Sequence, residues 1–230
     1  MVLYELCNAS NESMSPYCWR VRESLLLLEI PFESRLVGFQ EIHQLFTGLN
    51  KTVPILLDGE REVGGSWEIA QHLSTYHDPH NKLFGNEEQR ILASFITNWA
   101  DATLLARTNR MLVKDNHDGF RPADQAYFRR VEEARQGQSL EKAQAARESE
   151  KLELQKLLHP ARLLIKNRPF LGGATPTFAD CVLHSTFQWS RLVTDFELLR
   201  PDDGLHDWIH RMDDWVTTQT SLVKIITTEI

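Results

Sequence analysis

The four residues Ser15-Pro16-Tyr17-Cys18 have the spacing of a redox dithiol in which the first sulfur is replaced by oxygen. Without a second thiol, Cys18 cannot form the intramolecular disulfide that dithiol chemistry requires, and we expect it to be a small buried hydrophobic residue. Serine is a poor nucleophile unless a base lies beside it, and no adjacent residue is of that kind. The Ser15 hydroxyl can instead donate a hydrogen bond to a thiolate that another molecule supplies, at a helix N-terminus that stabilises the same anion. The alternative is that Ser15 is only a helix cap.

The elements that position these residues follow from the pattern of the N-terminal third of the chain. Ser15 is a favoured N-cap residue, and Pro16 suits the first helical position, where a missing N–H has no cost. Asp58-Gly59 is a signal for a tight hairpin turn. The predicted elements, in order, are a strand over 2–7, a helix over 15–29, a strand over 31–39, a short helix over 40–50, a hairpin over 53–65 and a helix over 66–77. This βαβαββα order indicates an α/β domain.

The rest of the chain follows a linker that is rich in helix breakers, and it has only helical periodicity. Residues 88–114 predict one long amphipathic helix, and residues 132–158 predict a highly charged helical segment with a solvated face. Residues 175–193 predict a helix that starts at Thr177, with Asp180 placed for a capping box. We therefore expect everything after residue 87 to be helical.

Composition and charge exclude several classes of function. The chain has 230 residues, of which 42% are hydrophobic and 25% are charged, as in ordinary globular proteins. Its net charge of -7 argues against a nucleic-acid partner, which requires a basic surface. No apolar run approaches the roughly 20 residues of a membrane span, and the N-terminus lacks the features of a secretory signal. Three cysteines without a CxxC pair suit a reducing compartment, so we expect a cytoplasmic protein that does not bind a membrane.

Four separated motifs together identify a family. They are SPYCWRVR at the start of the first helix, TVP before the third strand, GSWEIAQHL at the next helix and TPTFAD in the helical half. In this order the chain resembles the soluble glutathione transferases, and SPYCWR, GSW and the charged segment are most similar to the etherase-like branch of bacterial lignin β-etherases and fungal FuA-type transferases. The resemblance implies a thioredoxin-like glutathione-binding domain over 1–80, an all-α domain over 87–230 and a homodimer.

The resemblance also implies roles for individual residues. Ser15 matches the position that stabilises the glutathione thiolate, although Ser10 and Ser13 are competing candidates in the same loop. Val53 precedes a proline that matches the family's cis Pro54, and its backbone would pair with the cysteinyl part of glutathione. Ser66 matches the serine that binds the γ-glutamyl carboxylate, where a simple helix cap is the alternative.

The sequence departs from the family pattern just before this serine. Many relatives carry Glu, Asp or Gln there to hold the γ-glutamyl ammonium, whereas this chain has Gly65. Glu68 or Asp101 is a possible replacement. For the glycyl carboxylate of glutathione, Lys51 and His43 are the candidates in the matching region.

The second substrate is expected to contact the helical half. Trp189 and the stretch from Trp99 to Met111 are candidates for an acceptor pocket that takes hydrophobic aromatic molecules, with core packing as the alternative. His206 and His210 have zinc-pair spacing without a third ligand, so we expect no metal. The favoured function is a serine-type glutathione transferase, including glutathione-dependent ether cleavage. A non-catalytic ligandin and a regulatory protein that reuses the fold are the alternatives.

Overall fold

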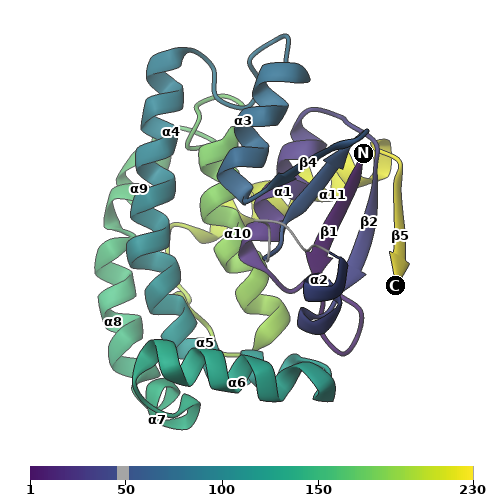
Figure 1. Ribbon diagram of the computed structural model, residues 1–230. Helices are drawn as coiled ribbons and strands as arrows, with labels where there is room; N and C mark the ends of the chain where they lie inside the picture. The colour runs from purple at the N-terminus through teal and green to yellow at the C-terminus, as the bar shows by residue number, and fades with distance from the viewer. Residues whose placement is uncertain (46–51, 230) are drawn as a thin grey trace.

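The computed structural model describes residues 1–45 and 52–229, and its N-terminal part is built on one mixed sheet (Figure 1). The sheet has the strand order β4-β3-β1-β2-β5. Its strands are β1 (Val2–Leu6), β2 (Phe32–Val37), β3 (Ile55–Asp58), β4 (Arg61–Gly64) and β5 (Ile225–Glu229). β1 pairs parallel with β2 and antiparallel with β3, and β3 and β4 form the predicted hairpin. Gly59 has a positive φ of 61°, as the Asp58-Gly59 turn signal requires.

Three helices complete the N-terminal part. They are α1 (Pro16–Leu27), α2 (Phe39–Leu45) and α3 (Ser66–Tyr76). The predicted βαβαββα order is therefore confirmed. α1 packs against α3 and against α10 of the helical half, so the helix that follows Ser15 is buried between the two parts of the molecule.

The second part is helical, which confirms the predicted fold class. Its elements are α4 (Glu87–Trp99), the π-helix η1 (Ala100–Leu105), α5 (Ala106–Gly119), α6 (Pro122–Gln136), α7 (Leu140–Ala145), α8 (Arg147–Leu157), α9 (His159–Ile165), α10 (Phe178–Val193) and α11 (His206–Leu222). In Figure 1, α10 lies between the sheet and the outer helices α4, α8 and α9. Within the described ranges, no helix is both long and apolar enough to cross a membrane.

The helical half departs from prediction in how its long segments are divided. The single helix predicted over 88–114 is α4, η1 and α5, because η1 widens one stretch of the helix to π geometry. The charged segment over 132–158 contains three helices: Gly137 ends α6 with a positive φ of 68°, and Ser139 caps α7 by accepting a bond from the Lys142 N–H. The side chains of this charged segment are nearly all exposed or half-buried, as expected for a solvated face.

The C-terminal strand corrects the expectation that everything after residue 87 is helical. β5 pairs parallel with β2, from Phe32 opposite Ile225 to Leu36 opposite Glu229. The segment has only five residues but is rich in β-branched residues, which favour strands. β5 covers the edge of β2, so the sheet of the N-terminal part includes residues from the far end of the chain (Figure 1).

The start of α10 is fixed by the predicted capping box. The Asp180 carboxylate accepts the backbone N–H of Thr177 at 3.0 Å and that of Leu171 at 2.7 Å. It also accepts the indole N–H of Trp208 in α11 at 3.1 Å. Because a buried carboxylate is stable only when its oxygens are hydrogen-bonded, Asp180 joins α10, α11 and the preceding loop.

A buried charge network joins α1 to the helical half. His184 of α10 lies with Nδ1 2.7 Å from Glu23 of α1 and with Nε2 3.0 Å from Asp213 of α11. Burial alone would lower the pKa of His184, but the charge of Glu23 and the hydrogen bonds to both carboxylates outweigh it and raise the pKa to about 9. Arg191 donates to both oxygens of Asp213, at 2.7 and 2.8 Å. The imidazolium is thus held between two carboxylates.

This network generates a prediction for stability. His184→Phe leaves the Glu23 carboxylate buried without its partner, so it should lower the free energy of unfolding by about 3–5 kcal/mol in urea titrations. Glu23→Leu combined with His184→Phe should recover most of that loss, because no unpaired charge remains on α1.

The native chain and the double variant Glu23→Leu/His184→Phe should also differ in how their stability depends on pH. The pKa of His184 is raised in the folded state. Its contribution to the free energy of unfolding is therefore complete below about pH 6.5 and is lost as the pH rises through about 9. The stability of the native chain relative to the double variant should therefore decline between these pH values. A difference that stays constant over this range would show that His184 is not charged in the folded state.

Candidate functional site

A cavity of about 180 Å³ lies at the N-terminus of α1, where the sheet domain meets the helical half. Side chains from both parts line it, and most of them are apolar or aromatic. They are Leu6, Met14, Ser15, Pro16, Tyr17 and Phe39 from the first part, and Asp101, Leu105, Ala106, Asn109, Asn116, Phe120, Phe128 and Trp189 from the second. The cavity therefore combines a polar group at a helix N-terminus with a surface suited to flat apolar molecules.

Ser15 is the N-cap of α1, as predicted. Its Oγ accepts the backbone N–H of Cys18 at 3.4 Å, and Pro16 occupies the start of the helix. The side chain is largely buried and borders the cavity. Because a hydroxyl has one proton and two acceptor lone pairs, accepting the Cys18 bond leaves the Ser15 O–H able to donate to an anion. The cap and the donor roles are thus compatible.

The competing serines of the same loop are placed differently. The Ser13 hydroxyl donates to the buried Glu5 at 2.8 Å. Glu5 also accepts bonds from Ser34 at 2.6 Å and from Arg22 at 2.6 Å, so this carboxylate fixes the loop against the sheet. Ser10 is exposed. Of the three candidate serines, Ser15 is the one that lines the cavity.

Cys18 is a buried hydrophobic residue, as expected. It is fully buried, and burial raises the pKa of its thiol to about 12. Burial likewise raises the pKa of the Cys7 thiol to about 11. Because the thiolate is the reactive form of cysteine, neither residue can supply a nucleophile near neutral pH.

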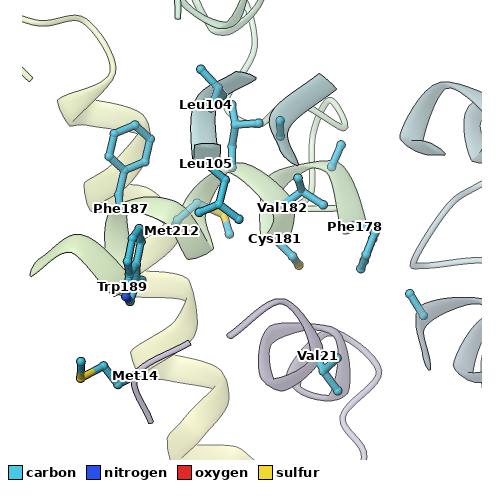
Figure 2. Packing of buried hydrophobic residues seen from close by; sticks show 14 of the residues in the cluster. Met14, Val21, Leu104, Leu105, Phe178, Cys181, Val182, Phe187, Trp189 and Met212 are labelled. Carbon is cyan, nitrogen blue, oxygen red and sulfur yellow. The ribbon is translucent and has the colours of Figure 1, made fainter. Parts of the chain in front are cut away.

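The wall formed by the helical half carries polar atoms that are buried and free of protein partners. These atoms are Oδ1 of Asn109, Oδ1 of Asn116 and Nε1 of Trp189, which make no hydrogen bond to any part of the chain that the structure describes. Figure 2 shows Trp189 extending from α10 on the side of Leu105 and Met14, which line the same cavity. A buried polar atom without a partner is costly, so these groups favour a ligand that offers both a donor and an acceptor.

Asp101, a residue of the π-helix η1, lies in the same wall. Arg20 of α1 is fully buried and donates to Asp101 at 2.6 Å. The Arg20 guanidinium also lies over the Tyr17 ring, 4.9 Å from its centroid. The pair fixes one edge of the cavity to the helix that begins at Ser15. π-Helical segments are frequent at functional sites, and this one interrupts the helix beside the cavity.

A second group of polar residues lies at the N-terminus of α3. In the register of β1 and β3, Tyr4 is opposite Ile55, so Pro54 lies at the edge of the sheet where β1 ends and the chain continues to Ser15. The Val53–Pro54 peptide bond is cis, as expected. The Pro54 carbonyl accepts the N–H of Gly65 at 3.0 Å.

Gly65 precedes α3 at the position where the sequence departs from the pattern of the family that it resembles. Its φ of +88° is one that residues with side chains rarely adopt, and a Cβ there would collide with the carboxylate of Glu68. Glu68 therefore occupies the space that the missing side chain would take, beside the buried Ser66. Asp101, the other suggested replacement, is instead paired with Arg20 beside the Ser15 cavity.

Comparison with known families matches this geometry. The sequence profile described as glutathione S-transferase, N-terminal domain, matches residues 13–81. The profile described as glutathione S-transferase, C-terminal domain, matches residues 92–215, which is more than half of the chain. The chain belongs to the glutathione S-transferase family.

Solved structures of glutathione S-transferases have the same fold. The glutathione transferase GSTFuA3 from Phanerochaete chrysosporium has a TM-score of 0.79 and 20% identity, and the match covers 96% of each chain. GSTFuA2 from the same fungus has a TM-score of 0.76 and 20% identity, covering 97% of this chain and 98% of that one. A Ceriporiopsis subvermispora glutathione S-transferase in complex with glutathione has a TM-score of 0.76 and 16% identity, covering 96% of this chain and 98% of that one.

The two residues predicted to bind the glycyl carboxylate of glutathione are His43 and Lys51. His43 is exposed, and its Nε2 lies 3.1 Å from the Tyr127 hydroxyl of α6, so it joins α2 to the helical half. Lys51 lies outside the described residues. A role for either in binding the glycyl carboxylate stays a prediction.

Two of the three acceptor residues are placed elsewhere than predicted. Trp99 lines a separate apolar groove with Phe95 of α4 and Leu164 of α9, and Met111 is fully buried in the core. Between these two residues, Asp101, Leu105, Ala106 and Asn109 of the predicted stretch do line the Ser15 cavity. Trp189 alone of the three lines the Ser15 cavity.

Sequence reasoning also missed one polar residue of this wall, Asn116. Asn109 and Asn116 are seven positions apart, which is about two helical turns. Both therefore lie on the face of α5 that borders the cavity. This spacing was visible in the sequence. The pairing of Arg20 with Asp101 was not, because the two residues are far apart in the chain and no local pattern links them.

Proposed function

We propose that this chain transfers glutathione, with Ser15 stabilising the glutathione thiolate for attack on an electrophilic aromatic substrate. The observation that carries the proposal is the position of the Ser15 hydroxyl, which caps α1 and also lines a largely apolar cavity. The buried cysteines have raised thiol pKa values, so the sulfur must come from the co-substrate. No metal has a part in this mechanism.

The chemistry that Ser15 supplies is stabilisation of an anion. A free thiol has a pKa of about 8.5, so only a small fraction is thiolate at neutral pH. A hydrogen bond to a charged group contributes about 1.5–3 kcal/mol, which corresponds to about one to two pKa units. The positive end of the α1 dipole adds to this effect at the same point.

Glutathione is proposed to lie along the sheet edge between Ser15 and the start of α3. The backbone of Val53, next to the cis Pro54, would pair with its cysteinyl group. Ser66 and the N–H groups of the first turn of α3 would bind the γ-glutamyl carboxylate, since a helix N-terminus favours anions. The carboxylate of Glu68, which fills the space over Gly65, would hold the γ-glutamyl ammonium.

The acceptor is proposed to be a hydrophobic phenol-derived molecule in the Ser15 cavity. Phe39, Phe120 and Phe128 offer aromatic surface, and the Trp189 indole N–H offers a donor to a phenolic oxygen. In ether cleavage, the thiolate sulfur would bond to the ether carbon as the C–O bond breaks, and the electron pair would leave on the aryl oxygen. Hydrogen bonding from Trp189 would stabilise that oxygen.

Storage of aromatic compounds without turnover is the second candidate. The cavity that carries Trp189 would bind phenolics equally well in a ligandin, because its walls do not depend on glutathione. Turnover with an electrophile and glutathione distinguishes the two functions.

Assembly as a homodimer in the cytoplasm completes the proposal. α4 exposes three large apolar side chains, Ile91, Leu92 and Phe95, of which Phe95 is 68% exposed. Exposed apolar patches of this kind mark interfaces, so α4 is the proposed dimer face. The three cysteines are free and buried, which suits a reducing compartment.

The role of Ser15 is tested by the pH dependence of turnover. Ser15→Ala should lower kcat/KM about tenfold or more at pH 6.5–7, and the loss should shrink above about pH 9, where glutathione ionises unaided. Ser10→Ala is the matched control, because Ser10 is exposed in the same loop and should leave the profile unchanged. A loss that is equal at all pH values would remove Ser15 from this role.

The glutathione site is tested by calorimetry. Ser66→Ala should weaken glutathione binding by about 1–3 kcal/mol, because a charged carboxylate loses a donor. Glu68→Gln should weaken it less, by about two- to fivefold, because the Glu68 side chain is exposed to solvent. Glu88→Gln, with the same charge change on the exposed start of α4, should have no effect. Equal affinities for the Glu68 and Glu88 variants would show that another group holds the ammonium.

The acceptor cavity is tested by displacement of an environment-sensitive apolar dye. Polyphenols should displace the dye, and glutathione should displace it only in part. Trp189→Phe keeps the aromatic surface but removes the indole N–H, so polyphenol affinity should fall about three- to tenfold. Trp99→Phe is the control, because Trp99 lines a different groove. If glutathione removes all the dye and polyphenols remove none, the cavity is not an acceptor site.

A further inference from the structure

Two imidazoles and one carboxylate converge beside the β3–β4 hairpin, away from the Ser15 cavity. Asp58 is the last residue of β3, His72 lies in α3 and His77 follows the end of α3. Oδ2 of Asp58 lies 2.8 Å from Nε2 of His72 and 2.6 Å from Nε2 of His77. One ligand atom from each residue lies within 4.8 Å of the other two.

The spacing is close to that of a metal centre. Tetrahedral zinc has bonds of about 2.0 Å to histidine nitrogen and carboxylate oxygen, so neighbouring ligand atoms are about 3.3 Å apart. The Asp58–His distances are slightly shorter than this value, so a small outward movement of the side chains would admit an ion. Each imidazole would then bind through Nε2 and keep its single proton on Nδ1.

The three side chains are held in place before any ion binds. The pairing of Asp58 with Arg61 closes the hairpin, which fixes the end of β3. The His72 ring packs on the Tyr76 ring at 4.8 Å, and the His77 backbone N–H binds the Leu73 carbonyl at 2.8 Å. Two of the ligands therefore belong to one helix end and the third to the strand beside it.

The burial of the group also suits a cation. The His72 side chain is 7% exposed, whereas those of Asp58 and His77 are 25% and 30% exposed, so the group is closed on one side and open to water on the other. Arg61 of β4 carries a positive charge, which would repel a bound cation. Its guanidinium lies over the Tyr76 ring, 5.1 Å from the ring centroid.

We propose that Asp58, His72 and His77 form a binding site for one divalent transition-metal ion of the zinc type, with water completing the coordination. Two histidines, one carboxylate and an open position are a ligand set that zinc accepts. The site would link the β3–β4 hairpin to the C-terminal end of α3, the helix whose other end carries Ser66. It lies outside the proposed glutathione chemistry and does not depend on it.

The test uses the full chain without a histidine tag, stripped of metal by a chelator. Zn²⁺ titrated by calorimetry should bind with one-to-one stoichiometry, and Co²⁺ should give the visible d–d bands of a four- or five-coordinate ion. A hundredfold excess of Zn²⁺ over its Kd should raise Tm by about 5 °C or more. His77→Ala and Asp58→Asn should each weaken Zn²⁺ binding by at least about 10- to 100-fold, because each removes a direct ligand.

Controls separate this site from other histidines. His80→Ala changes an exposed residue three positions beyond His77, and His206→Ala breaks the other histidine pair; both should bind Zn²⁺ as the native chain does. Circular dichroism of the metal-free variants should match that of the native chain, and His77→Ala is the main variant because its side chain is partly exposed. Absence of one-to-one Zn²⁺ binding, its persistence in both ligand variants, or its loss in His206→Ala would overturn the proposal.

Discussion

Helix α1 buries two charged side chains, Arg20 and Glu23, and each is neutralised by a residue of the helical half. A buried charge without a partner is costly, so α1 is stable in its position only when Asp101 and His184 are in theirs. The position of α1, a helix of the sheet domain, therefore depends on residues of the helical half. Ser15 caps α1, so the same contacts that hold α1 in place also hold Ser15.

The Ser15 cavity follows from this arrangement of α1. One wall is the sheet domain, with Ser15 at its edge, and the other is presented by η1, α5 and α10. Arg20 of α1 binds Asp101 of the π-helix, so this irregular stretch is tied to the helix that Ser15 caps. Asn116 lines this cavity, and its buried Oδ1 has no partner in the described part of the chain. Under the proposed function, a bound acceptor would satisfy such groups.

Local signals in the sequence predicted much of the fold and part of the site. Ser15 with Pro16 predicted the start of α1, and Thr177 with Asp180 predicted the start of α10, because caps depend on residues within one turn. Contacts across the chain were not predictable in this way. Met111 lies in the core, although the stretch that it ends was predicted to line a pocket. Trp189 lines the Ser15 cavity, and its role toward an acceptor stays a prediction.

The pairing of β5 with β2 has a consequence for synthesis on the ribosome. β2 is made early, whereas its parallel partner β5 emerges only after all the helices that the structure describes. During translation the hydrogen-bonding groups of β2 on that side have no native partner, and unpaired strand edges are prone to pairing between nascent chains. The sheet thus reaches the width that the structure shows only after β5 has emerged from the ribosome.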